Sequence, residues 1–303
     1  MLDRDTFLTA LYVFIDDFVQ TQPAASRPGP APQLSPSEVL TLLVFSRWRR
    51  FASERDFYRY AQRELRGCFP TLPDRSQFVR QAQHCYPLLA GCLRQLARQL
   101  GAGRAAYQVL DQTPVPVRDA KRRGSSWLEG QAALGHSTRL GWFFGFQLLL
   151  SVTPDGVISG VALAPGNAKD QPLAGDFLRA RAAQPAGTES VGDAYDGVYV
   201  ADKGFEGMAR RGHGQVLTAP KGRTRRRWSK PWRQWLARRR QIVEAVNDKL
   251  HNEAGLSCPR GRRHSLAGQL VHVAAACTLH NLLAWLNTQL ERPLLAFADL
   301  FHC

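Results

Sequence analysis

From residue 107 onward, short apolar runs of strand length alternate with stretches that have helical spacing. The strand-like runs are YQVLDQTPVPV, GWFFGFQLLLSVT, GVISGVALAPG, GVYVADKGF and GQVLTAP. Their β-branched and aromatic residues favour strands, and the TPDG turn between the second and third runs indicates a hairpin. The helical stretch QPLAGDFLRARAA before GVYVADKGF indicates a crossover to a parallel strand. This pattern predicts an α/β domain on a mixed sheet with an antiparallel start and a later parallel addition.

The first hundred residues have a different pattern, because their apolar residues recur at three- and four-residue spacing. We expect an all-α DNA-binding domain over 1–102, with a proline-rich linker at 22–36, and a second domain over 103–303. The stretch DRSQFVRQAQ begins with capping residues and carries Arg75 and Arg80, which suit contacts in a DNA groove. A solvated helix face is the alternative interpretation.

The chain is strongly basic, with 40 Lys and Arg residues against 25 Asp and Glu residues and a formal net charge of +15. Such a balance indicates polyanionic partners. The basic segment at 221–240 has ten basic residues and no acidic one, interleaved with Trp228, Trp232 and Trp235. We interpret it as a phosphate-binding surface, with a solvated charged face as the alternative. Its expected DNA contacts include Arg223, Arg225, Arg226 and Arg227.

Several other classes of protein are disfavoured by missing motifs. The sequence has no Cys/His spacing for zinc, no GxSxG elbow, no phosphate-binding P-loop and no GxGxxG fingerprint. The six scattered cysteines are typical of reduced thiols. The longest apolar run is interrupted by polar residues, and the N-terminus does not resemble a secretory signal. We therefore expect a cytoplasmic, nucleoid-associated protein with no membrane partner.

Three carboxylates stand in positions that favour metal chemistry. Asp111 follows YQVL and Asp202 follows GVYVA, so each is expected at the end of a buried strand, whereas Glu244 borders the apolar stripe of WRQWLARRRQIVEAVNDKLHNE. Carboxylates without Cys or His neighbours suit Mg²⁺ or Mn²⁺, and two such ions about 4 Å apart could assist phosphodiester transfer. A turn or cap role for either Asp, and an ion pair of Glu244 with Arg240, are the alternatives.

In this order, LDQTPVPV, FFGFQLLLSVTPDGVI, LAPGNAKDQ, VADKGF and RRQIVEAVNDKL resemble the DDE transposases of bacterial insertion sequences, closest to the insertion sequence 982 family. The resemblance covers nearly the whole chain. It implies a ribonuclease H-like core, a mixed five-stranded sheet with flanking helices, with Asp111 on the first strand, Asp202 on the fourth and Glu244 on the helix after the sheet. It also implies that these three residues are catalytic and hold two Mg²⁺ ions, which Mn²⁺ can replace.

The resemblance implies a reaction and partners as well. Such an enzyme binds the terminal inverted repeats of its element, cleaves a strand to expose a 3′-hydroxyl and joins that end to target DNA. We therefore expect double-stranded DNA, both transposon ends and target, as the partner, and a homodimer or higher assembly in the synaptic complex. Lys203, Arg240 and His251 are expected at DNA phosphates, and Asp170 matches a recurrent acidic position to which we assign a structural role.

Two alternative functions remain open. One is a DNA-binding protein derived from such an enzyme that no longer cuts DNA, although three aligned carboxylates would serve no purpose there. The other is a metal-dependent nuclease on the same fold. Metal-dependent cleavage separates the binding protein from the two enzymes, and joining of a free 3′ end separates the transposase from the nuclease.

Overall fold

Two compact units make up the chain. The computed structural model describes residues 2–23, 31–49, 51, 53–120, 128–183, 193–208, 212–213, 215–219, 228–257, 265–298 and 300. Unit 1 comprises Met1–Leu96 and Asn252–Cys303, and unit 2 comprises Ala97–His251. The C-terminal residues, which the sequence led us to expect with the sheet, are therefore grouped with the N-terminal helices.

Unit 1 is helical. Its helices are α1 (Arg4–Gln20), α2 (Pro36–Trp48), α3 (Glu54–Glu64), α4 (Arg75–His84), most of α5 (Tyr86–Gln99) and α8 (Leu266–Gln289). The C-terminal α8 packs against α2 and α4. Its length and composition would allow it to cross a membrane, but 78% of its most apolar window is buried. Because core helices of soluble proteins have the same composition, α8 has the character of a central core helix of this unit.

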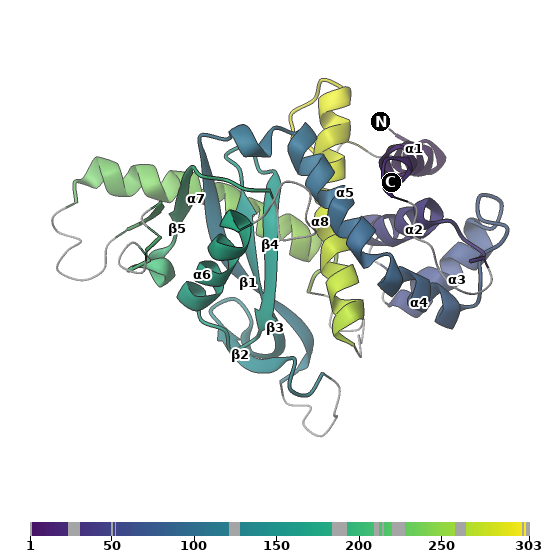
Figure 1. Ribbon diagram of the computed structural model, residues 1–303, viewed down its shortest axis with the longest axis horizontal. Helices are drawn as coiled ribbons and strands as arrows, with labels where there is room; N and C mark the ends of the chain where they lie inside the picture. The colour runs from purple at the N-terminus through teal and green to yellow at the C-terminus, as the bar shows by residue number, and fades with distance from the viewer. Residues whose placement is uncertain are drawn as a thin grey trace. The chain divides into compact units, whose positions relative to one another are not determined.

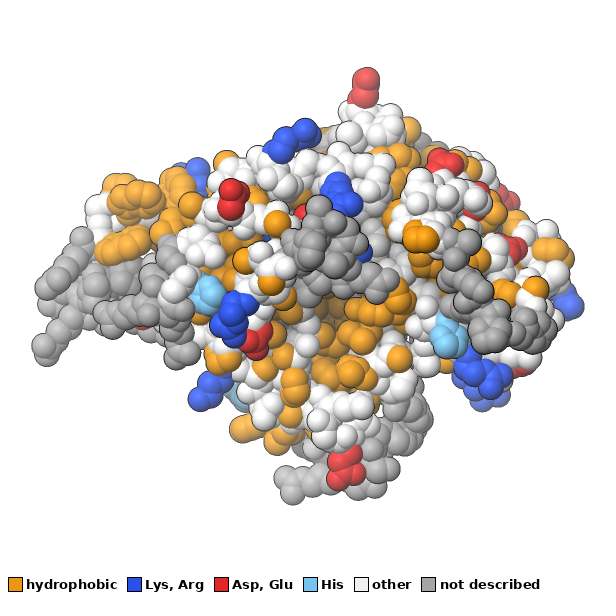
Figure 2. All heavy atoms as spheres, viewed as in Figure 1, with side chains coloured by type: hydrophobic (Ala, Val, Ile, Leu, Met, Phe, Trp, Pro, Cys, Tyr) orange, Lys and Arg blue, Asp and Glu red, His pale blue; other side chains and the backbone are white. Residues whose placement is uncertain are grey.

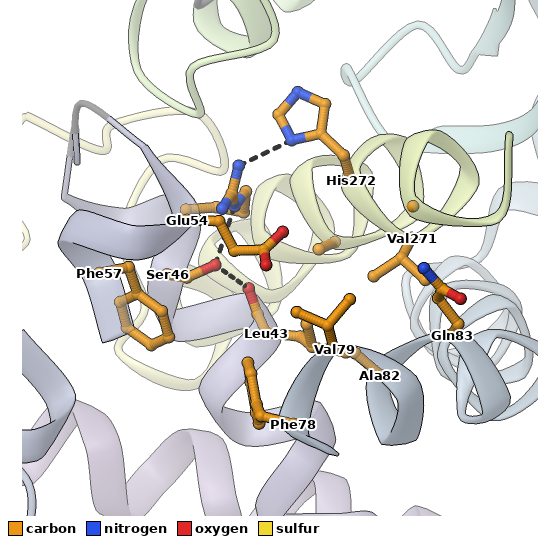
Figure 3. A pocket seen from close by; sticks show the side chains of 13 residues that line it. Leu43, Ser46, Glu54, Phe57, Phe78, Val79, Ala82, Gln83, Val271 and His272 are labelled. Atoms are coloured by element: carbon orange, nitrogen blue, oxygen red, sulfur yellow. Dashed lines mark hydrogen bonds between the residues drawn. The ribbon is translucent and has the colours of Figure 1, made fainter. Parts of the chain in front are cut away.

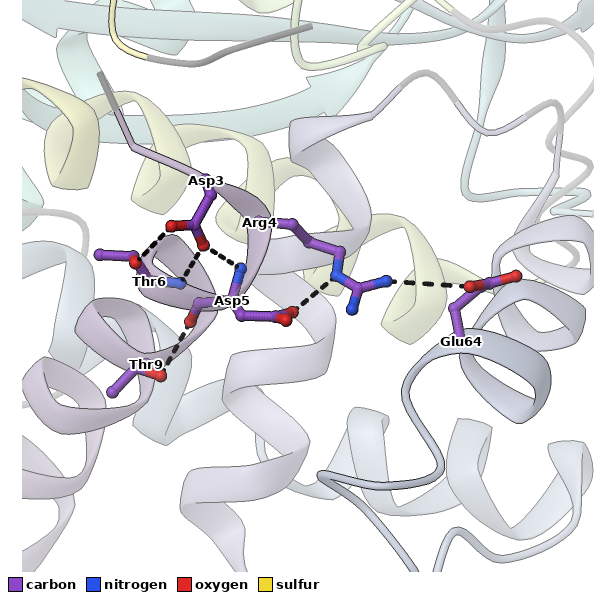
Figure 4. Close-up of polar contacts among 6 residues, drawn as sticks. All are labelled: Asp3, Arg4, Asp5, Thr6, Thr9 and Glu64. Atoms are coloured by element: carbon purple, nitrogen blue, oxygen red, sulfur yellow. Dashed lines mark hydrogen bonds and ion pairs between the residues drawn. The ribbon is translucent and has the colours of Figure 1, made fainter.

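Polar side chains fix the start of α1 in unit 1. The Asp3 carboxylate accepts hydrogen bonds from the backbone N–H groups of Asp5 and Thr6, at 2.9 and 2.8 Å (Figure 4). These two N–H groups have no partner inside the helix, so the cap stabilises it by about 1 kcal/mol. Arg4 bonds the Asp5 carboxylate at 2.7 Å and reaches Glu64 of α3 at 3.8 Å. Both ion pairs are exposed, and their contribution to stability is small.

Unit 2 is built on a six-stranded mixed sheet. The strands are β1 (Tyr107–Asp119), β2 (Ala133–Ser137), β3 (Gly141–Val152), β4 (Ile158–Pro165), β5 (Val198–Ala201) and β6 (Val216–Thr218). Strand β3 is antiparallel to β1, β2 and β4, whereas β5 and β6 run parallel to β1. The predicted α/β class with an antiparallel start and a parallel addition is confirmed. The sheet has six strands rather than the expected five because the short β2 also pairs with β3.

Two helices of unit 2 cover opposite faces of this sheet. Successive side chains of a strand point to opposite faces. Leu110 of β1 packs in the core against Leu173 and Phe177 of α6 (Asp170–Ala182). The odd-numbered residues of β1 face the other way, toward α7 (Lys230–Asn252), which runs along the strand. In Figure 1, α6 lies in front of the sheet and α7 passes behind it.

A buried polar network ties α6 to the segment that leads into β5. Arg181 is only 3% exposed, and its guanidinium donates to the side-chain oxygen of Gln108 at 2.9 Å and to the backbone oxygen of Asp193 at 2.8 Å. Burial lowers the pKa of Arg181, so its hydrogen bonds are required to offset the loss of water. Because Gln108 belongs to β1, the network fixes the chain before β5 against β1.

Candidate active site

The parallel register of β1 and β5 places two carboxylates side by side. Leu110 is opposite Ala201, so the next residues of the two strands are Asp111 and Asp202. Asp202 directly follows β5 and caps the short helix η2 (Lys203–Phe205), accepting a 2.6 Å hydrogen bond from the N–H of Gly204. Asp111 lies within β1, and not at the strand's end as expected, because pairing with β3 continues to Asp119.

Helix α7 supplies three more polar side chains to the same place. Arg240, Glu244 and Asn247 are spaced by four and three residues, which puts them on one face of a helix. The Asn247 amide donates to Asp111 Oδ2 at 2.9 Å. An Nη2 atom of Arg240 is 4.0 Å from both Asp111 Oδ1 and Glu244 Oε1. Arg240 therefore lies between Asp111 and Glu244, and the strand register puts Asp202 beside Asp111.

The negative charge of Asp111 is disfavoured at this position. Burial, together with the neighbouring carboxylates of Asp202 and Glu244, raises the pKa of Asp111 to about 7, against the opposing effect of Arg240. Its side chain is 19% exposed, whereas that of Glu244 is 63% exposed. A partly buried carboxylate beside two others favours a bound cation.

The donor atoms are of the type that Mg²⁺ and Mn²⁺ prefer, namely oxygens. Asn247 Oδ1 is buried and has no hydrogen-bond partner among the described residues, so one more oxygen near Asp111 is left without a donor. Within the described ranges, no three His, Cys, Asp or Glu side chains stand close enough together to hold a metal ion as they are oriented. Asp111 and Asp202, which follow the paired residues Leu110 and Ala201, and the exposed Glu244 offer oxygen donors of the type that a divalent cation takes.

The first turn of helix α6 fixes the backbone that follows Asp202. The Gln171 amide donates to the backbone oxygens of Gly204 and Glu206, at 3.2 and 2.6 Å. A Cβ at Gly204 would overlap an oxygen of Asp170 and would lie 2.8 Å from Asp202 Oδ1. The expected structural role of Asp170 agrees with this position against the turn. Sequence reasoning missed Gln171 and Asn247, although the spacing of Asn247 behind Arg240 and Glu244 was a signal available for one of them.

The other predicted DNA contacts are scattered. Lys203 is exposed on η2, directly after Asp202, whereas Arg75 and Arg80 are exposed on α4 of unit 1. Arg240 is 27% exposed and lies between two carboxylates, as the alternative ion-pair interpretation would have it. Arg223, Arg225, Arg226 and Arg227 lie outside the described residues.

His251 is buried, and this placement does not favour the expected phosphate contact. The side chain is 5% exposed, and its Nε2 lies 2.6 Å from the hydroxyl of Thr113 on β1. Burial, and to a smaller extent Arg139, lowers the pKa of His251 to about 4. The imidazole is therefore neutral at physiological pH and does not offer a phosphate a positive charge. The last turn of α7 packs this side chain against the sheet instead of exposing it.

A separate hollow lies in unit 1 among α2, α3, α4 and α8 (Figure 3). Its polar wall contains Arg47, which bonds the hydroxyl of Ser46 at 2.9 Å and the Nδ1 atom of His272 at 2.7 Å. The cavity volume of about 40 Å³ is sufficient for a few water molecules and far below that of a typical ligand pocket. The carboxylate site of unit 2 remains the stronger candidate.

A comparison with known protein families matches a range that lies mostly in unit 2. The family described as "Transposase DDE domain" matches residues 104–264, a range that contains Asp111, Asp202 and Glu244. No curated protein matches the chain. A solved structure of the Mos1 transposase paired-end complex with left transposon end is 10% identical over 82% of this chain and 86% of that chain. Its TM-score of 0.19 is too low to support any structural argument.

Proposed function

The chain belongs to the transposase DDE domain family, and on that premise we propose that it cuts DNA at the ends of an insertion sequence and joins the exposed 3′-hydroxyl to target DNA. The observation that carries the proposal is the parallel register that sets Asp111 beside Asp202, within reach of Glu244 on α7. From the motifs of the protein sequence, we propose that this transposase belongs nearest to the insertion sequence 982 family.

The proposed core is ribonuclease H-like. Its support is a mixed sheet in which the first strand is central, an antiparallel hairpin follows it, and parallel strands lie on its other side. In this arrangement one carboxylate comes from the central strand, one follows the neighbouring parallel strand, and one comes from the helix that runs along the central strand. Rigid elements hold all three backbones, which limits how far the carboxylates can move.

Divalent cations held by Asp111, Asp202 and Glu244, two Mg²⁺ or Mn²⁺ ions in our proposal, would activate a water or 3′-hydroxyl and stabilise the leaving oxygen. The chain's own side chains prepare this site. The Asn247 amide holds one oxygen of Asp111 and so leaves the other directed away from it. Gln171 fixes the turn behind Asp202, and the guanidinium of Arg240 stands where it can bind a phosphate oxygen brought to the carboxylates.

DNA is held, in this proposal, by positive charge on both units. Lys203 contacts the strand next to the cut, and the basic segment 221–240 holds the flanking phosphates. Arg75 and Arg80 on α4 contact the terminal repeats. Pairing two transposon ends requires a homodimer or a larger assembly, and the substrate places the protein in the cytoplasm at the nucleoid.

The test is cleavage and strand transfer on labelled DNA that carries the element's own ends, with Mg²⁺ or Mn²⁺. Asp202→Asn should reduce both products by more than about a hundredfold, because it removes a charge from the cation site. The matched control is Asp248→Asn, which alters an exposed carboxylate of α7 that pairs with Arg139 at 3.5 Å. Cleavage without joining would indicate a metal-dependent nuclease. Binding without any cleavage by the wild type would indicate an inactive DNA-binding protein.

A further inference from the structure

A ladder of aromatic rings leads away from the carboxylate site along β1 and α7. Its rings, which we call the aromatic ladder, are Tyr107, Trp235, Trp232 and Trp228. Neighbouring ring centroids are 6.4, 5.0 and 6.2 Å apart in that order. The guanidinium of Arg239 lies 4.0 Å from the centre of the Trp235 ring. The inner rungs are thus fixed by packing to the same strand and helix that carry the site.

The outer part of the ladder is open to solvent. Trp232 is 52% exposed, an unusual condition for the largest apolar side chain. Figure 2 shows exposed hydrophobic side chains on the left of the view, over the segment of α7 that Figure 1 draws there. An exposed aromatic patch of this kind is typical of a binding site.

The charge around the aromatic ladder indicates which kind of partner it binds. From Lys230 to Arg240 the helix carries five basic residues and no acidic one. Basic side chains beside exposed aromatic rings form the combination that binds single-stranded nucleic acid, because cations track the phosphates while bases stack on the rings. A second copy of this chain is a poorer occupant, because two surfaces of the same positive charge repel each other.

We propose that the aromatic ladder binds the unpaired DNA strand next to the cut by base stacking, with Trp232 as the main stacking residue. A paired duplex hides its base faces, so this contact requires bases freed from pairing. Four strand residues, about 13 Å, separate Tyr107 from Asp111, and twelve helix residues, roughly 18 Å, separate Trp232 from Glu244. These lengths correspond to roughly four to five nucleotides at about 3.4 Å each. The inference rests on the proposed function, because it identifies the substrate strand of that same site.

The test compares two labelled DNA probes of one duplex sequence, a blunt probe and a probe with a short single-stranded extension, by fluorescence anisotropy at one salt concentration. The full-length proteins are the wild type, Trp232→Leu, Trp232→Phe and the control Trp142→Leu, which alters another exposed tryptophan, 65% exposed on β3. The wild type should bind the extended probe more tightly. Trp232→Leu should lose roughly 5- to 100-fold on that probe alone, and Trp232→Phe should retain most of the gain.

Several outcomes would overturn the inference. Equal binding of both probes by the wild type would do so, as would a Trp232→Leu protein that binds the extended probe like Trp142→Leu. A Trp232→Leu protein that dissociates into smaller assemblies in sedimentation, with its preference for the extended probe intact, would assign the ladder to contact between copies. A wild type that keeps a Trp232-dependent preference but cuts no DNA with metal would overturn the proposed function alone.

Discussion

The carboxylate of Asp170 lies against Gly204, in the space that the Cβ of any other residue there would fill. Gly204 does not have the positive φ angle that usually requires glycine, so space is the reason for its small size. Its N–H bonds the carboxylate of Asp202, and its carbonyl accepts from Gln171. The position of one proposed ligand therefore depends on the absence of a single methyl group.

Gly204→Ala should displace the Asp202 carboxylate while the fold survives. An error of about 1 Å at reacting groups can reduce the rate roughly a hundredfold. We expect metal-dependent cleavage to fall by at least tenfold and Mn²⁺ binding, followed by electron paramagnetic resonance, to weaken. Gly103→Ala is the matched control, because a Cβ there meets no atom within 4 Å. Equal cleavage by the two variants would show that the contact with Asp170 has no role in positioning Asp202.

Asn247→Leu should weaken metal binding without removing any carboxylate. The variant loses the 2.9 Å hydrogen bond that orients Asp111 and also the buried Oδ1 atom. Residues that orient metal ligands typically contribute 10- to 100-fold to metal affinity or activity, and we expect a loss in that range. Isothermal titration with Mn²⁺ measures it, with the exposed amide variant Gln241→Leu as control. An unchanged Mn²⁺ affinity would show that Asn247 does not support the metal site.

Asp111→Asn should stabilise the protein in metal-free buffer. The substitution removes a partly buried charge that Asp202 and Glu244 oppose, and an amide of the same shape takes its place. The gain should be on the order of 1–3 kcal/mol in the free energy of unfolding at pH 8, measured by urea denaturation with a chelator. Adding Mn²⁺ should raise the melting temperature of the wild type and leave that of the variant nearly unchanged. A variant that responds to Mn²⁺ like the wild type would contradict Asp111 as a ligand.

The buried His251 should make stability depend on pH between about 6.5 and 4. Its pKa falls from 6.5 in the unfolded chain to about 4 in the folded one, so the unfolded state takes up a proton first as the pH drops. This contribution is fully present above pH 6.5 and is lost as the pH falls, by about 3 kcal/mol in total. His251→Gln, which can still bond Thr113 but does not titrate, should lose this part of the slope. The urea midpoint measured across this pH range checks the difference, and parallel curves for the two proteins would refute it.

The α/β class and the two aspartates could be predicted from sequence because both depend on local patterns. A run such as GVYVA is apolar enough to identify a buried strand, and the residue after it must lie at the strand's end. Asp111 was placed less well, because the apolar run YQVL before it suggested a strand end, whereas pairing with β3 continues β1 to Asp119. The partner strand that decided that boundary, β3, begins only at Gly141.

Contacts between distant segments account for the rest. Nothing near Gln171 indicates that its amide reaches Gly204, and nothing near His251 indicates that Thr113 will cover it. Residues 252–303 join the N-terminal helices because the apolar α8 needs other helices around it, and the sequence does not say which helices those are. Arg240 combines the two cases. Its i,i+4 contact with Glu244 could be predicted from the sequence, whereas its approach to Asp111 could not.

The contacts of α7 along β1 limit how the length of this helix can change. One helix carries Trp235, Asn247 and His251, and their partners, Tyr107, Asp111 and Thr113, are all on β1. Inserting a single residue between Trp235 and Glu244 would rotate everything after it by about 100° and turn Asn247 away from Asp111. An insertion of seven residues, about two full turns, would restore the rotation but would lengthen the helix by roughly 10 Å and so would still separate one set of partners. The number of helix residues between Trp235 and Asn247 is therefore fixed by the spacing of Tyr107 and Asp111 on β1.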